Sequence, residues 1–444
     1  MHANARVLLY SDTDNAGDLA GKLEQHGFQP LPATSREDAL RIVTGRFPDI
    51  AIVDADRTAE GSQFRQDLRD LSPEGSMPTI VIGAADEATA DDDSLQIEFL
   101  PAPFRDAELF SRLETLSRLV TMQGELTLRS ETSELYGMEA PAHVARPDRI
   151  SNSRVLLIAD DDGQRDAVID MIAPQKSLVA AVDVVTQPYE AIERLLQTEF
   201  DAVVAVRGDN AEGLLNLCRD LRHHANLFNM PLLVLCDDDD VMAHDQAYEA
   251  GASDVLELAD AGPRLLPRLE HLVKQQRYRQ AMQEVYRQSR HYAGNDALTG
   301  LFGHGYLHTH LQKQITECLA RDKDLAIGFF DIARMSGFNG EYGYVAGDRL
   351  LRQIGGAIGG LVRAEDLPAR FGGDKFCVVL PDTNMTSAAP VLHRIAGFIN
   401  FTEFALLDVG EPVKVHLQTG CAGLQAGDTA ESLIARARAD STGT

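Results

Sequence analysis

The chain has 444 residues, is 44% hydrophobic and 25% charged, and carries a formal net charge of −27. This charge repels nucleic acid and anionic membranes, and no apolar run approaches the ~20 residues that cross a bilayer. The N-terminus lacks the apolar stretch of a signal peptide, and the five cysteines are scattered without CxxC pairs. We therefore expect a cytoplasmic protein with buried free thiols, no nucleic-acid partner and no membrane insertion, in which local arginines hold any anionic ligand.

Two segments of the chain begin alike, with RVLLYSD at residues 6–12 and RVLLIAD at residues 154–160. Each continues with helical patterns that alternate with fully apolar runs: Ile50–Val53, Thr79–Ile82, Ala202–Val206 and Leu232–Leu235. Such runs predict a parallel sheet that is covered on both faces. The sequence thus predicts an α/β protein with two tandem flavodoxin-like domains, residues 1–121 and 151–275, joined by a partly helical linker at 122–150.

A helical segment rich in Arg, Gln and Glu follows the second unit and connects it to the third. We place this connecting helix at residues 276–294 and the third domain at residues 295–444. A solvated helix accounts for the composition, and a two-stranded coiled coil is the alternative.

Both early units resemble response-regulator receiver domains. Receiver chemistry needs clustered acids for Mg²⁺, an Asp that accepts phosphate, a hydroxyl residue and a lysine. The first unit keeps Asp54 at the acceptor position and Asp12 among the acids, but Gly83 and Ala102 replace the hydroxyl residue and the lysine. Asp54 is therefore a candidate phosphorylation site whose modification lacks the usual means of biasing the fold.

The second unit has lost the acceptor itself, because Val206 stands at that position. Cys236 and Leu258 replace the hydroxyl residue and the lysine. We expect this unit to be structural, and the pair to act as a packing or dimerisation platform or as a docking surface for another protein.

The third domain carries an ordered set of short motifs. They are DALTGL at 296–301, an apolar strand at 325–332 that contains Asp331, then Asn339, Asp348, RAED at 363–366 and GGD at 372–374. Together they resemble the GGDEF family of diguanylate cyclases. The resemblance implies a palm-like α/β domain of the nucleotide-cyclase type, in an overall layout similar to receiver–receiver–GGDEF proteins.

The cyclases condense two GTP molecules into cyclic di-GMP, which requires carboxylates for two metal ions and cations for the triphosphate. The resemblance places Asp331 and Asp374 at metal-ligand positions, and Asn339 and Asp348 at positions that read guanine. Several other positions of this residual substrate site have changed: Gly303, His304, Ala333, Ser336, Gly340, Tyr344 and Lys375. Since a lysine repels divalent metal, we expect no bound metal, no required cofactor and no cyclase activity.

A second site is predicted at Arg363-x-x-Asp366. An arginine fork donates two hydrogen bonds to guanine O6 and N7, and a nearby carboxylate accepts from guanine N1–H and N2–H. In the family this motif is the inhibitory site for cyclic di-GMP, and the resemblance adds Arg394 as its second arginine. A surface ion pair worth ~0–1 kcal/mol is the structural alternative for Arg363 and Asp366.

The sequence as a whole favours a non-catalytic cyclic di-GMP receptor that changes protein–protein contacts. A weakly active diguanylate cyclase controlled by receiver-mediated dimerisation is one alternative, and an adaptor that binds no nucleotide is another. The layout also resembles effectors of the cell cycle. That resemblance implies a homodimer, recruitment to a cell pole, and protein partners bound through a receiver domain, among them proteolysis adaptors.

Overall fold

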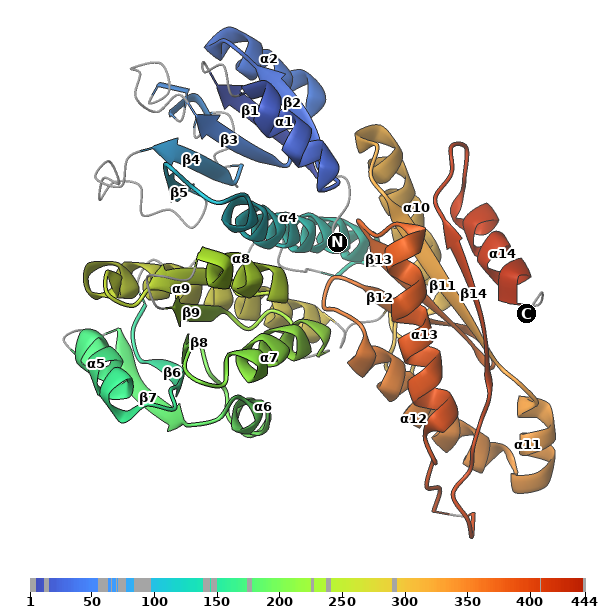
Figure 1. Ribbon diagram of the computed structural model, residues 1–444. Coiled ribbons are helices and arrows are strands. Elements are labelled where there is room, and N and C mark those ends of the chain that lie inside the picture. Colours follow the sequence, from blue (N-terminus) through green and yellow to red (C-terminus); the bar gives the residue numbers. More distant parts are fainter. Residues whose placement is uncertain are drawn as a thin grey trace.

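The structure is a computed structural model in three α/β parts (Figure 1). It describes residues 5–11, 16–54, 63–64, 66–68, 70, 77–83, 97–138, 144, 150–173, 178–224, 227–236, 241–289, 294–407 and 409–441. Two of the parts are built on parallel sheets and lie on one side of the molecule, and the third lies on the other side.

The first unit is a five-stranded parallel sheet with the order β2-β1-β3-β4-β5. Its elements are β1 (Arg6–Ser11), α1 (Ala16–Gln25), β2 (Gln29–Ala33), α2 (Arg36–Arg46), β3 (Ile50–Asp54), β4 (Thr79–Gly83) and β5 (Ile97–Pro101). Separate hydrophobic clusters lie on its two faces, so the central strands are apolar on both sides. This is the flavodoxin-like strand order.

The second unit repeats this arrangement with the order β10-β9-β8-β6-β7. Its elements are β6 (Ser153–Ile158), α5 (Asp162–Ile172), β7 (Val179–Val185), α6 (Pro188–Gln197), β8 (Ala202–Val206), α7 (Ala211–His223), β9 (Leu232–Cys236), α8 (Val241–Ala250) and β10 (Asp254–Glu257). The prediction of two N-terminal parallel-sheet domains is confirmed.

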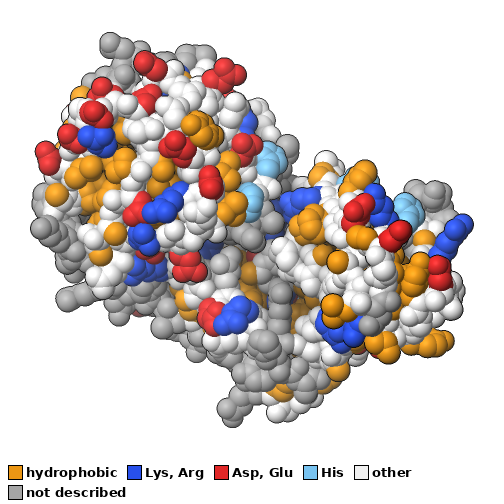
Figure 2. Space-filling view, turned by 90° about the horizontal axis from the view of Figure 1, so that it is seen from below, with side chains coloured by type: hydrophobic (Ala, Val, Ile, Leu, Met, Phe, Trp, Pro, Cys, Tyr) orange, Lys and Arg blue, Asp and Glu red, His pale blue; other side chains and the backbone are white. Residues whose placement is uncertain are grey.

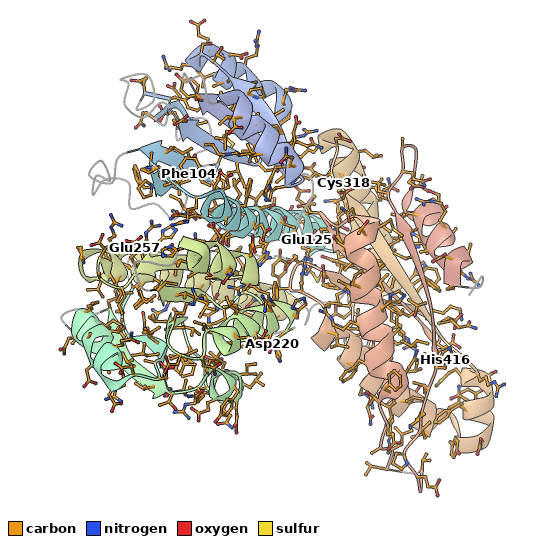
Figure 3. The ribbon with its side chains drawn as sticks, viewed as in Figure 1. Phe104, Glu125, Asp220, Glu257, Cys318 and His416 are labelled. Atoms are coloured by element: carbon orange, nitrogen blue, oxygen red, sulfur yellow. The ribbon has the colours of Figure 1, made fainter. Side chains whose placement is uncertain are left out.

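Two long helices, α4 (Asp106–Leu135) and α9 (Ala261–Ser289), connect the three parts. The boundaries predicted at 121 and at 275 both fall inside these helices. The C-terminal half of α9 is not solvated: Tyr278, Met282 and Tyr286 are buried in one cluster with apolar residues of α4. The expectation of an exposed connecting helix is therefore wrong, because its apolar positions pack within the chain. Figure 3 shows Glu125 where α4 reaches the third domain.

The third domain contains a four-stranded antiparallel sheet with the order β12-β13-β11-β14. Its elements are α10 (His304–Arg321), β11 (Leu325–Ile332), α11 (Met335–Tyr342), α12 (Tyr344–Leu361), β12 (Leu367–Gly372), β13 (Lys375–Pro381), α13 (Met385–Phe401), β14 (Leu417–Gly423) and α14 (Ala430–Ser441). The tight turn between β12 and β13 requires Gly372 and Gly373, whose φ angles are 148° and 59°.

Seen from below, the surface is indented where the two N-terminal units meet the third domain (Figure 2). Among the described helices, none is both long enough and apolar enough to span a membrane.

Candidate functional site

The hairpin at Gly372 brings Lys375 between two acids. Lys375, the first residue of β13, pairs in register with Asp331 of β11. Its Nζ lies 3.3 Å from Asp331 Oδ2 and donates a 2.7 Å hydrogen bond to Asp374 Oδ1. The hydrogen bond to Asp374 and the charge of Asp331 raise the pKa of Lys375, although partial burial opposes them. The ammonium therefore neutralises both acids at the predicted metal-ligand positions.

This arrangement does not fit a divalent cation. A metal would have to displace a charged lysine that is ion-paired to both candidate ligands. Within the ranges that the structure describes, no three His, Cys, Asp or Glu side chains gather as metal ligands. We therefore derive no metal-dependent step at this site.

The residues predicted to read guanine in the substrate site lie on α11 and α12. Asn339 packs against Gly347, where a Cβ atom would lie 2.0 Å from Asn339 Oδ1. In the described part of the chain, Asn339 Oδ1 is buried without a hydrogen-bond partner. Asp348 is exposed one residue after Gly347. This half of the substrate site thus retains an unused acceptor.

The second predicted site is the loop between α12 and β12, which holds Arg363 and Asp366. Asp366 Oδ2 accepts a 2.8 Å hydrogen bond from the backbone N–H of Arg363, which closes a tight turn. Asp366 is only 2% exposed. Burial raises the pKa of Asp366 to about 7, although the Arg363 charge opposes the shift. We call residues 363–366 the clamp loop.

Arg394 of α13 lies beside the clamp loop. Its Nη2 donates a 3.1 Å hydrogen bond to Leu361 O at the end of α12. Burial and the positive charge of Arg363 lower the pKa of Arg394, and Asp366 acts in the opposite direction. The structure therefore brings the three predicted ligand-binding residues close enough to interact.

The clamp loop is closed in this conformation. Arg363 and Asp366 line a cavity of about 20 Å³, which is the size of one water molecule. The guanidinium of Arg363 instead lies over the ring of Phe228 in the second unit, 5.7 Å from its centroid. A guanine can reach Asp366 only if this cavity widens.

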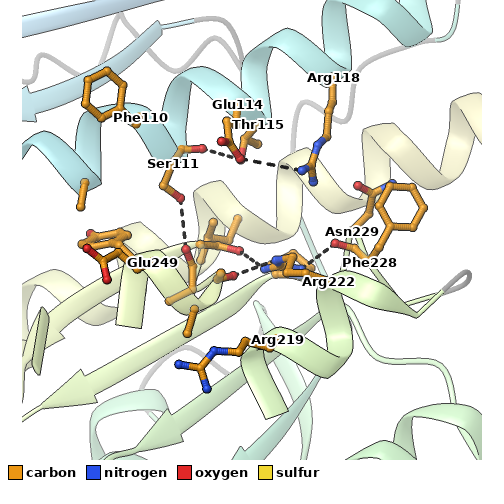
Figure 4. Close-up of a pocket in the computed structure, with 18 of the residues that line it drawn as sticks. Phe110, Ser111, Glu114, Thr115, Arg118, Arg219, Arg222, Phe228, Asn229 and Glu249 are labelled. Atoms are coloured by element: carbon orange, nitrogen blue, oxygen red, sulfur yellow. Dashed lines mark hydrogen bonds and ion pairs between the residues drawn. The ribbon is translucent and has the colours of Figure 1, made fainter. Parts of the chain in front are cut away.

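Arg363 also lines a larger pocket of about 920 Å³ between the clamp loop, α4 and the second unit. Figure 4 shows Arg118 of α4 and Arg222 of α7 on its walls. Arg222 donates to the backbone oxygens of Gly251 and Phe228, at 2.7 Å each, and Arg118 lies 3.9 Å from Glu114. We call this cavity the interdomain pocket.

The interdomain pocket concentrates positive charge. Burial is the main cause that lowers the pKa of each of three arginines, and the charges of neighbouring arginines add to it. The pKa of Arg118 is lowered, that of Arg222 falls to about 10, and that of Arg279 falls to about 9. Arg279 is 5% exposed, and its Nε has no partner among the described residues. In a chain with a net charge of −27, this cluster fits an anionic ligand.

Sequence reasoning missed Arg118, Arg222 and Arg279. They come from α4, α7 and α9, and the sequence contains no local motif that links them. Only the docking of the second unit beside α4 brings them together.

The predicted phosphoacceptor, Asp54, is the last residue of β3. Its Oδ2 accepts a 3.0 Å hydrogen bond from Ser11 Oγ at the end of β1. The predicted acid Asp12 lies outside the described residues. In the second unit, Val206 occupies the equivalent strand end and is buried.

Comparison with known proteins assigns the third domain. Residues 293–441 match the family described as "Diguanylate cyclase, GGDEF domain". This part of the chain is therefore a GGDEF domain, related to diguanylate cyclases.

The similarity extends over the whole chain in one relative. The response regulator PleD of Caulobacter vibrioides is 26% identical over 440 residues, which cover 98% of this chain and 95% of PleD. This similarity indicates that the two parallel-sheet units are receiver domains.

Other relatives match about a third of the chain. The diguanylate cyclase DgcP of Pseudomonas aeruginosa is 30% identical over 142 residues, 32% of this chain and 21% of DgcP. A crystal structure of the GGDEF domain of DgcB from Caulobacter crescentus in complex with c-di-GMP is 23% identical, with a TM-score of 0.33. It covers 34% of this chain and 87% of that chain.

Proposed function

We propose that this protein is a non-catalytic receptor for cyclic di-GMP. The ligand binds at Arg363, Asp366 and Arg394, and binding changes protein–protein contacts. The observation that carries the proposal is that these three residues converge on a loop that also opens onto the arginine-lined interdomain pocket.

The chemistry of the ligand matches these two features. Each guanine offers O6 and N7 to an arginine fork and N1–H and N2–H to a carboxylate. The two phosphodiester groups are anions, which arginines bind through charge-assisted hydrogen bonds. The clamp loop supplies the first set of groups, and the arginines that line the interdomain pocket supply donors for the second.

The absence of catalysis is part of the same proposal. Lys375 occupies the space between Asp331 and Asp374, so binding of metal there would first have to break two ion pairs. Ala333 cannot supply a further carboxylate. Phosphoryl transfer depends on metal ions to offset charge on the phosphates, so the loss of these ligands removes the main source of rate acceleration.

One observation favours a second candidate function. Asn339 Oδ1, which has no partner among the described residues, can still accept from guanine, and PleD-like domain order is compatible with a weak cyclase controlled by receiver-mediated dimerisation. Incubation of the purified protein with GTP and Mn²⁺ tests this alternative. Product that disappears in Asp374→Ala would support it.

The protein contacts that the ligand changes are proposed to lie on the receiver domains. A ligand can alter them only if it binds one domain arrangement better than another. Homodimer formation, polar recruitment and proteolysis adaptors as partners stay predictions that rest on resemblance.

Equilibrium dialysis with radiolabelled cyclic di-GMP tests the receptor proposal. We expect retention by the wild type and competition by unlabelled cyclic di-GMP but not by GTP. Equal competition by GTP would assign the binding to the substrate site instead.

A further inference from the structure

The backbone of the clamp loop accepts hydrogen bonds from a residue of α4, one of the two helices that connect the three parts. Arg129, in the segment predicted to be a linker, projects from α4. Its Nη1 donates to Ala364 O at 3.2 Å, and its Nη2 donates to Glu365 O at 2.7 Å and to Asp366 O at 2.9 Å. One guanidinium therefore fixes three consecutive carbonyl groups of the loop that carries the ligand-binding residues.

The guanidinium of Arg129 is itself fixed in place. It is 2% exposed and lies 4.6 Å from the ring centroid of Tyr286 and 5.5 Å from that of Phe302. Its Nε donates to Glu125 Oε1 at 2.7 Å. Burial disfavours its charge, but Glu125, Tyr286 and Tyr306 together raise the pKa of Arg129.

Glu125 links this arginine to the GGDEF domain (Figure 3). His310 and Gln314 of α10 lie 2.8 Å from Glu125 Oε1 and Oε2, respectively. Burial opposes the charge of Glu125, yet His310 and Arg129 lower its pKa. Glu125 is thus paired with His310 and with the amide nitrogen of Gln314 across the contact between α4 and α10, which makes the geometry of this junction costly to change.

A second contact connects the first receiver with the small cavity beside the clamp loop. Asp382 lines the small cavity with Arg363 and Asp366. Its Oδ2 accepts a 2.5 Å hydrogen bond from Thr121 of α4. Lys323 Nζ lies 3.6 Å from Asp382 Oδ2 and 2.9 Å from Asp49 Oδ1. Asp49 directly precedes β3 in the first receiver.

We propose that Arg129 is a positioning residue for the cyclic di-GMP site, and that docking of α4 on the GGDEF domain and ligand affinity are coupled through it. The inference rests on the proposed function of the clamp loop. Without the guanidinium, three carbonyl groups lose their donor and the turn between Arg363 and Asp366 can relax. Coupling is reciprocal, so the ligand also stabilises the docked position of α4.

The test compares Arg129→Gln with Arg112→Gln. Arg112 is a matched control, because it is also buried on α4 and ion-paired with a glutamate four residues earlier, Glu108. Its backbone partner is Phe99 O of the first receiver, not the clamp loop. Loss of either arginine is expected to reduce stability, whereas only loss of Arg129 should reduce affinity.

Affinity for cyclic di-GMP is measured by calorimetry below the unfolding temperature of every variant. We expect about tenfold weaker binding for Arg129→Gln, in line with the loss of charge-assisted hydrogen bonds, and less than about twofold for Arg112→Gln. Arg129→Lys, which keeps the charge, should recover part of the affinity. Arg129→Gln that binds within twofold of the wild type overturns the inference.

Hydrogen exchange of the wild type provides the same test if Arg129→Gln fails to fold. Cyclic di-GMP should slow amide exchange in residues 122–133 of α4 as well as in the clamp loop. If the ligand protects the clamp loop and leaves exchange in α4 unchanged, the coupling is contradicted and the proposed function stands. A wild type that does not bind cyclic di-GMP removes the proposed function, and the inference with it.

Discussion

The hairpin of the GGDEF domain and the interdomain pocket differ in how their positive charges are balanced. At the hairpin, one ammonium, that of Lys375, meets the two carboxylates of Asp331 and Asp374. Around the interdomain pocket, burial and the charge of Arg118 lower the pKa of Arg222, and burial with the charges of Arg118 and Arg222 lowers the pKa of Arg279. A site that satisfies its own charges has little need of a ligand, whereas one with surplus charge is stabilised by binding an anion. Under the proposed function, this difference would let a cyclase-like domain lose its reaction and keep a receptor site.

The largest expected effect comes from removing the guanine-binding arginine. Arg363→Ala should weaken cyclic di-GMP binding about 100-fold, because a bidentate arginine–guanine contact is worth ~1–3 kcal/mol and the attraction between the arginine and the phosphates is lost as well. Titration calorimetry measures the change. Arg352→Ala, an exposed arginine of α12, is the control and should bind normally. An Arg363→Ala variant with unchanged affinity would show that the ligand binds elsewhere.

Reversing the charge of Lys375 should remove the internal balance of charges that distinguishes the hairpin from the interdomain pocket. Lys375→Glu replaces the internal cation with a third carboxylate beside Asp331 and Asp374. We expect Mn²⁺ affinity to rise about 30-fold, or ~2 kcal/mol, because solvent and salt screen about half of the ~4 kcal/mol that unit charges 4 Å apart exchange at an effective dielectric constant of ~20. Electron paramagnetic resonance measures free Mn²⁺, and Lys375→Met is the uncharged control. Equal Mn²⁺ binding by the wild type and Lys375→Glu would contradict the role given to Lys375.

The clamp loop should respond to pH near neutrality. Asp366 has a pKa of about 7 in the folded protein, above its ordinary 3.8, and only the ionised form accepts both guanine N–H groups. Affinity for cyclic di-GMP should therefore increase about tenfold from pH 6 to pH 8. Asp366→Asn should bind weakly and lack this increase, and an identical pH profile in the two proteins would refute the assignment.

The same shift predicts a change in stability with the opposite sign. Because folding raises the pKa of Asp366, the folded state holds a proton that the unfolded state releases first. The free energy of unfolding should therefore fall as the pH rises from about 4 to about 7, and Asp366→Asn should flatten this part of the profile. Denaturant titrations at several pH values measure the effect.

The smallest effect on affinity is expected at Arg279, whose replacement should weaken ligand binding without lowering stability. Arg279→Met removes a buried charge whose Nε has no partner among the described residues. Replacement of such a charge by an apolar side chain is often neutral or stabilising, so the melting temperature of the ligand-free protein should not fall. Cyclic di-GMP binding should weaken about threefold, by a fraction of the ~1.5–3 kcal/mol of a hydrogen bond to a charged group. Lower stability with unchanged affinity would make Arg279 purely structural.

The sequence was sufficient to predict the parallel sheets, because fully apolar runs such as Ala202–Val206 arise when both faces of a sheet are covered. It also predicted that Arg363, Asp366 and Arg394 lie together, since the family's motif spacing places them on one loop and one neighbouring helix.

Two features could not be predicted, for physical reasons. Arg129 lies in a polar helix whose composition is typical of a solvated linker, and its burial depends on docking against α10. The arginines of the interdomain pocket come from three separate helices. Contacts between domains leave no periodic pattern in the sequence, so their pairing was visible only in the structure.

The most direct test measures ligand binding and GTP turnover on one preparation of the protein. The purified protein is titrated with cyclic di-GMP by calorimetry, and a second aliquot is incubated with GTP and Mg²⁺ and assayed for product by chromatography. The account predicts saturable binding of cyclic di-GMP and no product. Formation of cyclic di-GMP from GTP, or a titration without binding heat at several temperatures, would contradict it.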